Sequence, residues 1–302
     1  MTWSLGTDGG GSVRIPAAFT GTVALKPTYG LIPLYPASPF GTLAHAGPMT
    51  RAVEDAALMM DVLTLPDSRD WSALPPPPQS HITDLASGVA GLRIAFSPTL
   101  GHVKVDSQVE ARVRAAVDVL SDLAAEVEEV DPGFDDPVDA FHVLWFTGAA
   151  KSVEQFPEES WSKLDPGLRD ICEQGRGMTA MDYLQATAAR MRLGVLMGRF
   201  HETYALLVTP SVPIPAFEAG REVPEGSPSS RWTSWTPFTY PFNLTQQPAA
   251  SVPCGFTEDG LPVGLHVVGP RHADRLVLRV CKAYQDARPC ADALPPPGDG
   301  WR

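Results

Sequence analysis

Apolar residues between positions 92 and 130 follow the order strand, helix, strand. Residues 92–96 and 127–130 are short apolar runs typical of strands. Between them, apolar residues recur every three or four positions over residues 106–125, which predicts an amphipathic helix; they are Val105, Val109, Val113, Val117, Leu120 and Ala124. Two strands joined by such a helix pair in parallel through a right-handed crossover. This part of the chain therefore predicts an α/β layer.

Similar patterns predict further strands and helices. Apolar runs over residues 21–27 and 205–210 end at proline and predict buried strands. Residues 250–253 and 263–268 predict a pair of strands, with Gly260 in the turn between them. Helical spacing continues over residues 56–65, 137–156, 167–204 and 272–287, and we expect the first of these helices to start in a capping segment at Thr50.

The long helical pattern over residues 167–204 carries two local signals. Thr179 and Asp182 stand three positions apart and predict a capping box. Five apolar residues then keep one helical face and are expected to fill the core: Met181, Leu184, Ala188, Met191 and Val195.

Proline and glycine mark the connections. Residues 28–47 carry Tyr35, Phe40 and His45 and are predicted to be loop. Residues 66–78 contain four successive prolines and are interpreted as a surface connection. Residues 211–236 form a long Pro-, Gly- and Ser-rich segment. Its Trp232 and Trp235, with Phe238 just beyond it, either border a substrate entrance or cover the edge of the core.

Composition limits the function classes. The 302-residue chain is 44% hydrophobic and carries a net charge of −12, which argues against nucleic acid or an anionic membrane as a partner. Four cysteines (Cys172, Cys254, Cys281 and Cys290) show no CxxC spacing, so neither zinc nor a disulfide framework is expected. No apolar leader or membrane-length run is visible. A cytoplasmic enzyme of small molecules fits this composition.

Candidate chemistry is concentrated near the amino terminus. Gly9, Gly10 and Gly11 precede Ser12, and Asp8 and Arg14 bracket this run. Without Cβ atoms the glycines can aim main-chain N–H groups at a bound carbonyl oxygen, and a hydroxyl directly behind them suits an acyl-transfer nucleophile. A pair of opposite charges could support the loop by hydrogen bonds. The spacing fits neither a Walker A loop nor a nucleophile elbow, and a plain turn is the alternative.

The run from Gly6 to Phe19, followed by Leu25-Lys26-Pro27-Thr28-Tyr29-Gly30, resembles the signature of the amidase signature family. Segments near residues 237–253 and 260–265 resemble the closing part of such enzymes. The resemblance implies a mixed α/β sheet flanked by helices, and amide hydrolysis without cofactor or metal. It makes Ser12 the catalytic nucleophile and the amides of Gly9, Gly10, Gly11 and Ser12 the oxyanion hole. His45 is interpreted as a structural residue because the family uses lysine as its base.

The family's lysine and bridging serine lie upstream of the signature, whereas only eleven residues precede Ser12 here. We therefore expect a partial amidase-signature domain over residues 1–290, missing the amino-terminal part of the fold, and a flexible tail over residues 291–302. Such a chain would expose apolar surface, so a homo-oligomer is expected. Three functions remain open: an amidase acting on a small carboxylic amide, a catalytically silent chain, and the amidase component of a tRNA-dependent amidotransferase.

Overall fold

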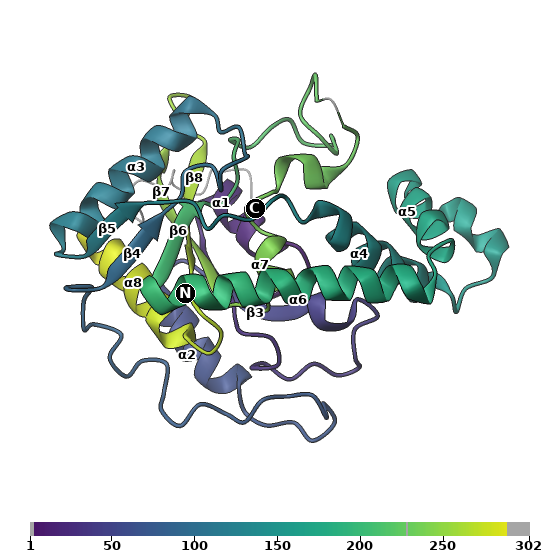
Figure 1. Ribbon diagram of the computed structural model, residues 1–302, viewed down its shortest axis with the longest axis horizontal. Helices are drawn as coiled ribbons and strands as arrows, with labels where there is room; N and C mark the ends of the chain where they lie inside the picture. The colour runs from purple at the N-terminus through teal and green to yellow at the C-terminus, as the bar shows by residue number, and fades with distance from the viewer. Residues whose placement is uncertain (1–2, 228, 289–302) are drawn as a thin grey trace, which may run out of the picture.

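The computed structural model describes residues 3–227 and 229–288, and its centre is one mixed β-sheet (Figure 1). Over these residues the sheet has eight strands in the order β1-β3-β2-β7-β8-β6-β4-β5. The strands are β1 (Ser4–Asp8), β2 (Val23–Lys26), β3 (His45–Thr50), β4 (Arg93–Phe96), β5 (Glu126–Glu129), β6 (Leu206–Pro210), β7 (Ala249–Phe256) and β8 (Pro262–Val268). Strand β4 pairs in parallel with β5 and β6, and the other neighbours are antiparallel. The predicted mixed α/β sheet is confirmed.

Helices cover both faces of this sheet. The helices are α1 (Arg14–Thr20), α2 (Val53–Leu63), α3 (Ser107–Asp122), α4 (Val138–Val153), α5 (Pro166–Arg176), α6 (Ala180–Thr203), α7 (Pro241–Leu244) and α8 (Asp274–Ala287), with 3-10 turns at Gly41–Leu43, Glu158–Lys163 and Trp232–Trp235. One apolar core contains residues of α2, α3 and α8. A second contains residues of α4, α6 and α7. In Figure 1, α6 crosses in front of the sheet and α5 lies at the end of α4 that points away from it.

Two helices begin close to where the sequence pattern places their start. Asp106 caps α3, because its carboxylate accepts from the amides of Gln108 and Val109. The capping box of Thr179 and Asp182 opens α6. Both observations follow from local rules, in which a short polar side chain satisfies the free N–H groups of the first helical turn.

Three sequence-based expectations are wrong. Residues 45–47, which were expected to end a loop, belong to strand β3. Thr50 does not cap α2; Ala52 stands at the N-cap, and the Thr50 hydroxyl donates to the Ala52 carbonyl at 2.7 Å. The apolar stripe of α6 faces outward: Met181 is 71% exposed, and Leu184, Ala188, Met191 and Val195 are not buried in the core either. The spacing of apolar residues therefore predicts that residues 180–203 are helical, but it does not predict which face of α6 packs on the core.

None of the helices within residues 3–227 and 229–288 is long and apolar enough to cross a membrane. The tail expected over residues 291–302, like Cys290, lies outside the described residues.

Candidate active site

The glycine loop, residues 9–13, joins the end of β1 to the start of α1. Gly11 has φ of 137°, a conformation that L side chains rarely adopt. A Cβ at this position would also lie 2.5 Å from the Thr239 hydroxyl oxygen. That hydroxyl donates to the Gly10 carbonyl at 2.6 Å. Glycine is thus required at position 11, where the loop turns against the segment before α7.

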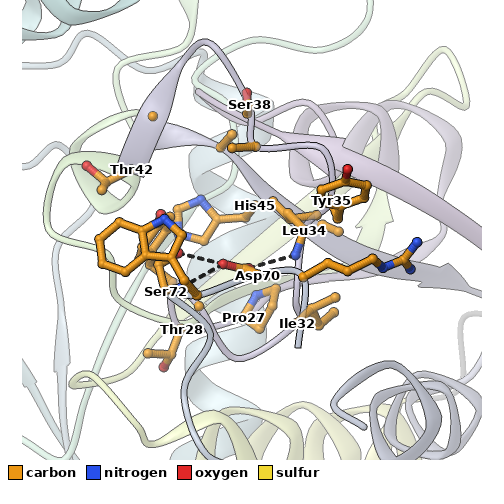
Figure 2. Close-up of a pocket in the computed structure, with 18 residues that line it drawn as sticks. Pro27, Thr28, Ile32, Leu34, Tyr35, Ser38, Thr42, His45, Asp70 and Ser72 are labelled. Carbon is orange, nitrogen blue, oxygen red and sulfur yellow. Dashed lines mark hydrogen bonds between the residues drawn. The ribbon is translucent and has the colours of Figure 1, made fainter. Parts of the chain in front are cut away.

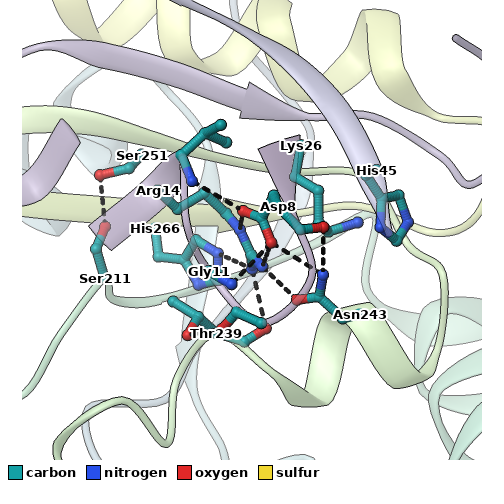
Figure 3. Close-up of polar contacts among 12 residues, drawn as sticks. Asp8, Gly11, Arg14, Lys26, His45, Ser211, Thr239, Asn243, Ser251 and His266 are labelled. Carbon is teal, nitrogen blue, oxygen red and sulfur yellow. Dashed lines mark hydrogen bonds and ion pairs between the residues drawn. The ribbon is translucent and has the colours of Figure 1, made fainter. Parts of the chain in front are cut away.

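Asp8 and Arg14 form a buried ion pair beneath this loop (Figure 3). Arg14 donates to both Asp8 carboxylate oxygens, at 2.9 and 3.0 Å. It also donates to the Asn243 side-chain oxygen at 2.6 Å and to the Thr239 carbonyl at 3.0 Å. Asp8 in turn accepts from the amide of Gly11 at 2.7 Å. The pair therefore ties the glycine loop to residues more than 200 positions away in the sequence.

The charged groups of this cluster shift one another's pKa values. Burial raises the pKa of Asp8, but the charge and hydrogen bonds of Arg14 outweigh it and hold that pKa well below its usual value. Burial, followed by the charge of Arg14, lowers the pKa of Lys26 and of His266 well below their usual values. Asp8 is therefore a carboxylate in the fold, and its role is to accept hydrogen bonds rather than to exchange protons.

Ser12 lies at the surface of the protein, next to this buried cluster. Its hydroxyl makes no hydrogen bond with any described residue, and it lines none of four cavities of the described chain, which have volumes of about 380, 400, 550 and 640 Å³. The amides of Gly9, Gly10 and Ser12 likewise have no hydrogen-bond acceptor within the described chain. The Gly11 amide differs, since it already donates to Asp8. The loop thus presents three free N–H groups rather than the four that the resemblance implies.

No lysine of the described chain serves Ser12. Lys26 comes closest in the sequence, but its side-chain Nζ donates to the main-chain carbonyls of Pro27 and Gln247. Ser4 stands at the opposite end of β1, where it pairs with Met49. The base and bridging serine that the resemblance calls for are therefore not found among the described residues.

Aromatic rings pack directly on the glycine loop. A Cβ on Gly9 would lie 2.5 Å from the Trp145 ring, and one on Gly10 would lie 2.8 Å from both Phe141 and Trp232. Trp145 and Trp232 also line the cavity of about 640 Å³, which we call the aromatic cavity. Its other lining residues include Phe40, His142, Phe146, Ile171 and Arg231. The same two indole rings therefore touch both the loop and the cavity.

The other two predicted pocket residues lie elsewhere. Trp235 stacks on Phe19, with ring centroids 5.7 Å apart, and its Nε1 donates to the Glu222 carbonyl at 3.1 Å. Phe238 is fully buried in the second core. Neither residue lines the aromatic cavity, so of the three proposed pocket residues the structure brings only Trp232 there.

His45 lines a different cavity, the one of about 380 Å³ (Figure 2). Its Nδ1 lies 2.8 Å from the Leu43 carbonyl, which fixes the proton on that nitrogen. Its Nε2 is buried without a partner in the described chain. Burial, followed by the charge of Lys26, lowers the pKa of His45 well below its usual value. The ring is therefore neutral and only half satisfied.

Sequence reasoning missed several residues of the site. Phe141 and Trp145 are four positions apart on α4, and this spacing alone places two rings on one helical face. Thr239 and Asn243 carry no comparable signal. Their partners Gly10, Asp8 and Arg14 lie more than 200 positions away, and only the folded sheet brings them together.

Comparison with known proteins gives one consistent family. The amidase family model matches residues 1–278. An acylamidase of Rhodococcus erythropolis is 36% identical over 297 residues, which cover 96% of this chain and 62% of that protein. A glutamyl-tRNA(Gln) amidotransferase subunit of Myxococcus xanthus is 33% identical, over 93% of this chain and 63% of that one.

A solved structure agrees with these sequence matches. A bacterial aryl acylamidase of the amidase signature family superimposes with a TM-score of 0.87 at 28% identity, covering 96% of this chain and 63% of its own. The present chain thus spans a little over three fifths of the length of the relatives that it matches.

Proposed function

Because this chain belongs to the amidase family, we propose that it takes part in the hydrolysis of a carboxylic amide with Ser12 as the nucleophile. The Ser12 oxygen attacks the amide carbonyl carbon and forms a tetrahedral adduct. Collapse of the adduct releases the amine and leaves an acyl ester on Ser12, which water then hydrolyses to the carboxylate. The observation that carries the proposal is the exposed Ser12 beside main-chain amides that are free of internal partners in the described chain.

The oxyanion hole in this proposal consists of the amides of Gly9, Gly10 and Ser12. Preorganised N–H donors stabilise the negative oxygen of the adduct, because they need no reorientation as charge develops. Gly11 is left out of this set, since its amide donates to Asp8 at 2.7 Å. Asp8 and Arg14 accordingly hold the shape of the loop and do not touch the substrate.

The acyl group occupies the aromatic cavity in this proposal. Trp145 and Trp232 contact the loop at Gly9 and Gly10, so a carbonyl bound on the loop would direct its substituent toward these rings. Large aromatic walls favour flat apolar groups. We therefore expect aryl and other apolar acyl amides to be preferred over acetyl amides.

Proton transfer limits the rate of the 302-residue chain. Ser12 must lose a proton to attack, and a serine without its proton-accepting partners loses several orders of magnitude in rate even when the oxyanion hole survives. Lys26 is engaged with main-chain carbonyls and does not serve as this acceptor in the described chain. The runner-up function, a catalytically silent chain, rests on this same observation.

Labelling with a fluorescent fluorophosphonate tests the nucleophile. We expect slow, stoichiometric labelling that mass spectrometry places on Ser12, and its loss in Ser12→Ala. Ser4→Ala is the matched control, because Ser4 is an exposed serine on the same strand–loop segment. If the folded chain is not labelled, or if Ser12→Ala is labelled as fast as the parent, the nucleophile assignment is wrong and the silent alternative stands.

The amidotransferase alternative has its own support in the similarity to the glutamyl-tRNA(Gln) amidotransferase protein of Myxococcus xanthus. It predicts co-purification with partner proteins and release of ammonia from glutamine. An enzyme that hydrolyses aryl amides but neither binds partners nor releases ammonia from glutamine would exclude this alternative.

A further inference from the structure

A cavity of about 550 Å³ lies along the exposed face of α6, next to α7 and the segment before α8. We call it the arginine cavity, because Arg190 and Arg271 both line it. Gly194 and Gly198 form an open floor, since a Cβ on either glycine would meet nothing within 4 Å. The cavity shares no lining residue with the aromatic cavity or with the glycine loop.

Charge is the first reason to regard this cavity as a binding site. The chain carries a net charge of −12, yet among the described residues neither Asp nor Glu lines the arginine cavity. Arg271 is exposed and makes no hydrogen bond or ion pair with any described residue. Arg190 has no carboxylate partner in the described chain either. Two cations without counter-ions, in an otherwise acidic protein, favour an anionic ligand.

Arg190 is held in place in advance. Its Nε donates to the Leu244 carbonyl at 2.8 Å, and its terminal nitrogens donate to Thr42 and to the Asn243 carbonyl. These acceptors are neutral, so they position the guanidinium without cancelling its charge. The pKa of Arg190 is lowered, mainly by burial and also by the charge of Arg271. This agrees with two cations that face the same cavity. An anion between them would relieve this repulsion.

Apolar surface is the second, independent feature. Met191 is 66% exposed and Val195 is 58% exposed, and both line the cavity beside the two arginines. An inorganic anion would leave these side chains in water, whereas an organic anion would cover them. The required ligand therefore carries a negative group at one end and an apolar body at the other.

We propose that the arginine cavity binds an organic carboxylate with an apolar body, with the carboxylate between Arg190 and Arg271 and the apolar part over Met191 and Val195. The site is separate from Ser12 and does not depend on the function proposed above. It is a second ligand site of this chain, formed by α6, the segment after α7 and the segment before α8.

Calorimetric titration of the full chain with benzoate tests this site. We expect one benzoate to bind per chain, neutral benzamide to bind much more weakly, and inorganic phosphate to compete poorly. Arg271→Ala should weaken benzoate binding about tenfold, the effect of one charge-assisted hydrogen bond, and Arg271→Lys should recover most of it. Raising the salt concentration should weaken benzoate binding as well.

Two matched variants make the test decisive. Arg192→Ala removes an arginine of α6 that does not line the cavity and should leave benzoate affinity unchanged. Trp232→Ala changes a residue that lines the aromatic cavity and packs on the glycine loop but does not line the arginine cavity, so it should also have no effect on benzoate affinity. Equal affinity for benzoate and benzamide, the same loss in Arg192→Ala as in Arg271→Ala, loss of binding in Trp232→Ala, or no binding at millimolar benzoate would each overturn the proposal.

Discussion

The carboxylate of Asp8 is shared between a guanidinium and a main-chain amide, and this sharing fixes the geometry around Ser12. Both Asp8 and Arg14 are completely buried. A buried ion pair adds little when it is compared with well-packed apolar residues, but the loss of one partner leaves the other charge in the interior without compensation. The geometry of the glycine loop therefore depends on Asp8, which holds both Gly11 and Arg14.

Asp8→Asn should lower the free energy of unfolding by about 3–5 kcal/mol, because Arg14 would remain buried without its counter-ion. Urea denaturation followed by circular dichroism measures this loss. Asp67→Asn is the control, because the Asp67–Arg69 pair is exposed and should contribute little. Unchanged stability of Asp8→Asn would mean that Arg14 is neutralised by another group.

Buried histidines should make the fold sensitive to mild acid. Burial lowers the pKa of His45 and His266, with the charge of Lys26 adding to the effect on His45 and that of Arg14 on His266. In the unfolded chain each ring titrates at about 6.5. Below that pH the unfolded chain therefore binds protons that the folded chain does not, and stability falls as the pH falls.

The urea midpoint should accordingly drop between pH 7.5 and pH 5.5. His266→Gln removes one of these rings and should make the dependence on pH shallower, whereas His272→Asn changes an exposed histidine and should leave it as it is. A midpoint that rises as the solution is acidified would show that the sign is wrong.

At this residue scale, the sequence could indicate the loop but not its supports. The glycine run, Ser12 and the bracketing charges of Asp8 and Arg14 are contiguous, so their chemistry can be read locally. The Gly11 amide donates to Asp8 and is therefore not one of the free amides. This hydrogen bond depends on the turn at Gly11, which no spacing rule predicts.

Glycine has different structural roles in helices α5 and α6. Gly175 of α5 lies against α4, where a Cβ would be 2.0 Å from the Phe146 carbonyl oxygen. Gly194 of α6 faces open space. The first glycine allows two helices to touch, whereas the second faces the open arginine cavity and lowers the helix propensity of α6.

Gly175→Ala should therefore destabilise the protein, because the backbones of α4 and α5 must move apart. Gly194→Ala should raise the free energy of unfolding by about 0.5–1 kcal/mol, the propensity difference between alanine and glycine. Thermal unfolding of the two variants side by side checks both signs. Equal shifts in the same direction would contradict the close contact at Gly175.

Elements that follow from local patterns were predicted, and elements that depend on long-range contacts were not. The parallel unit of β4, α3 and β5 was predicted because its pattern is local and regular. Strand β3 was missed because Gly47 and Pro48 are typical of loops. In the fold, Gly47 lets β3 approach β2 so closely that a Cβ would lie 2.0 Å from the Leu25 carbonyl oxygen, a long-range requirement that local patterns do not carry.

For the whole molecule, β1 forms an exposed apolar edge. This strand is the first of the sheet order, and only β3 pairs with it among the described strands. Leu5 of this strand is 55% exposed, and Trp3, directly before the strand, is 49% exposed. Unpaired strand edges associate with other strand edges, and identical edges can pair about a two-fold axis. We therefore expect the 302-residue chain to self-associate through β1.

Leu5→Lys should increase the monomer fraction, because a charge on an edge strand opposes pairing. Sedimentation velocity over a range of protein concentrations measures it. Leu65→Lys is the control, since Leu65 is similarly exposed but follows α2 rather than lying on the edge. If both variants and the parent sediment identically, β1 is not the contact.

The hydrogen bonds of Arg14 to Thr239 and Asn243 also impose an order on biosynthesis. A ribosome makes the Ser12 segment more than 200 residues before Thr239 and Asn243, whose oxygen atoms accept the hydrogen bonds of Arg14. The glycine loop is therefore synthesised early but reaches its final conformation late in folding. A nascent chain stalled before Thr239 should accordingly remain unreactive toward serine-directed reagents at all incubation times.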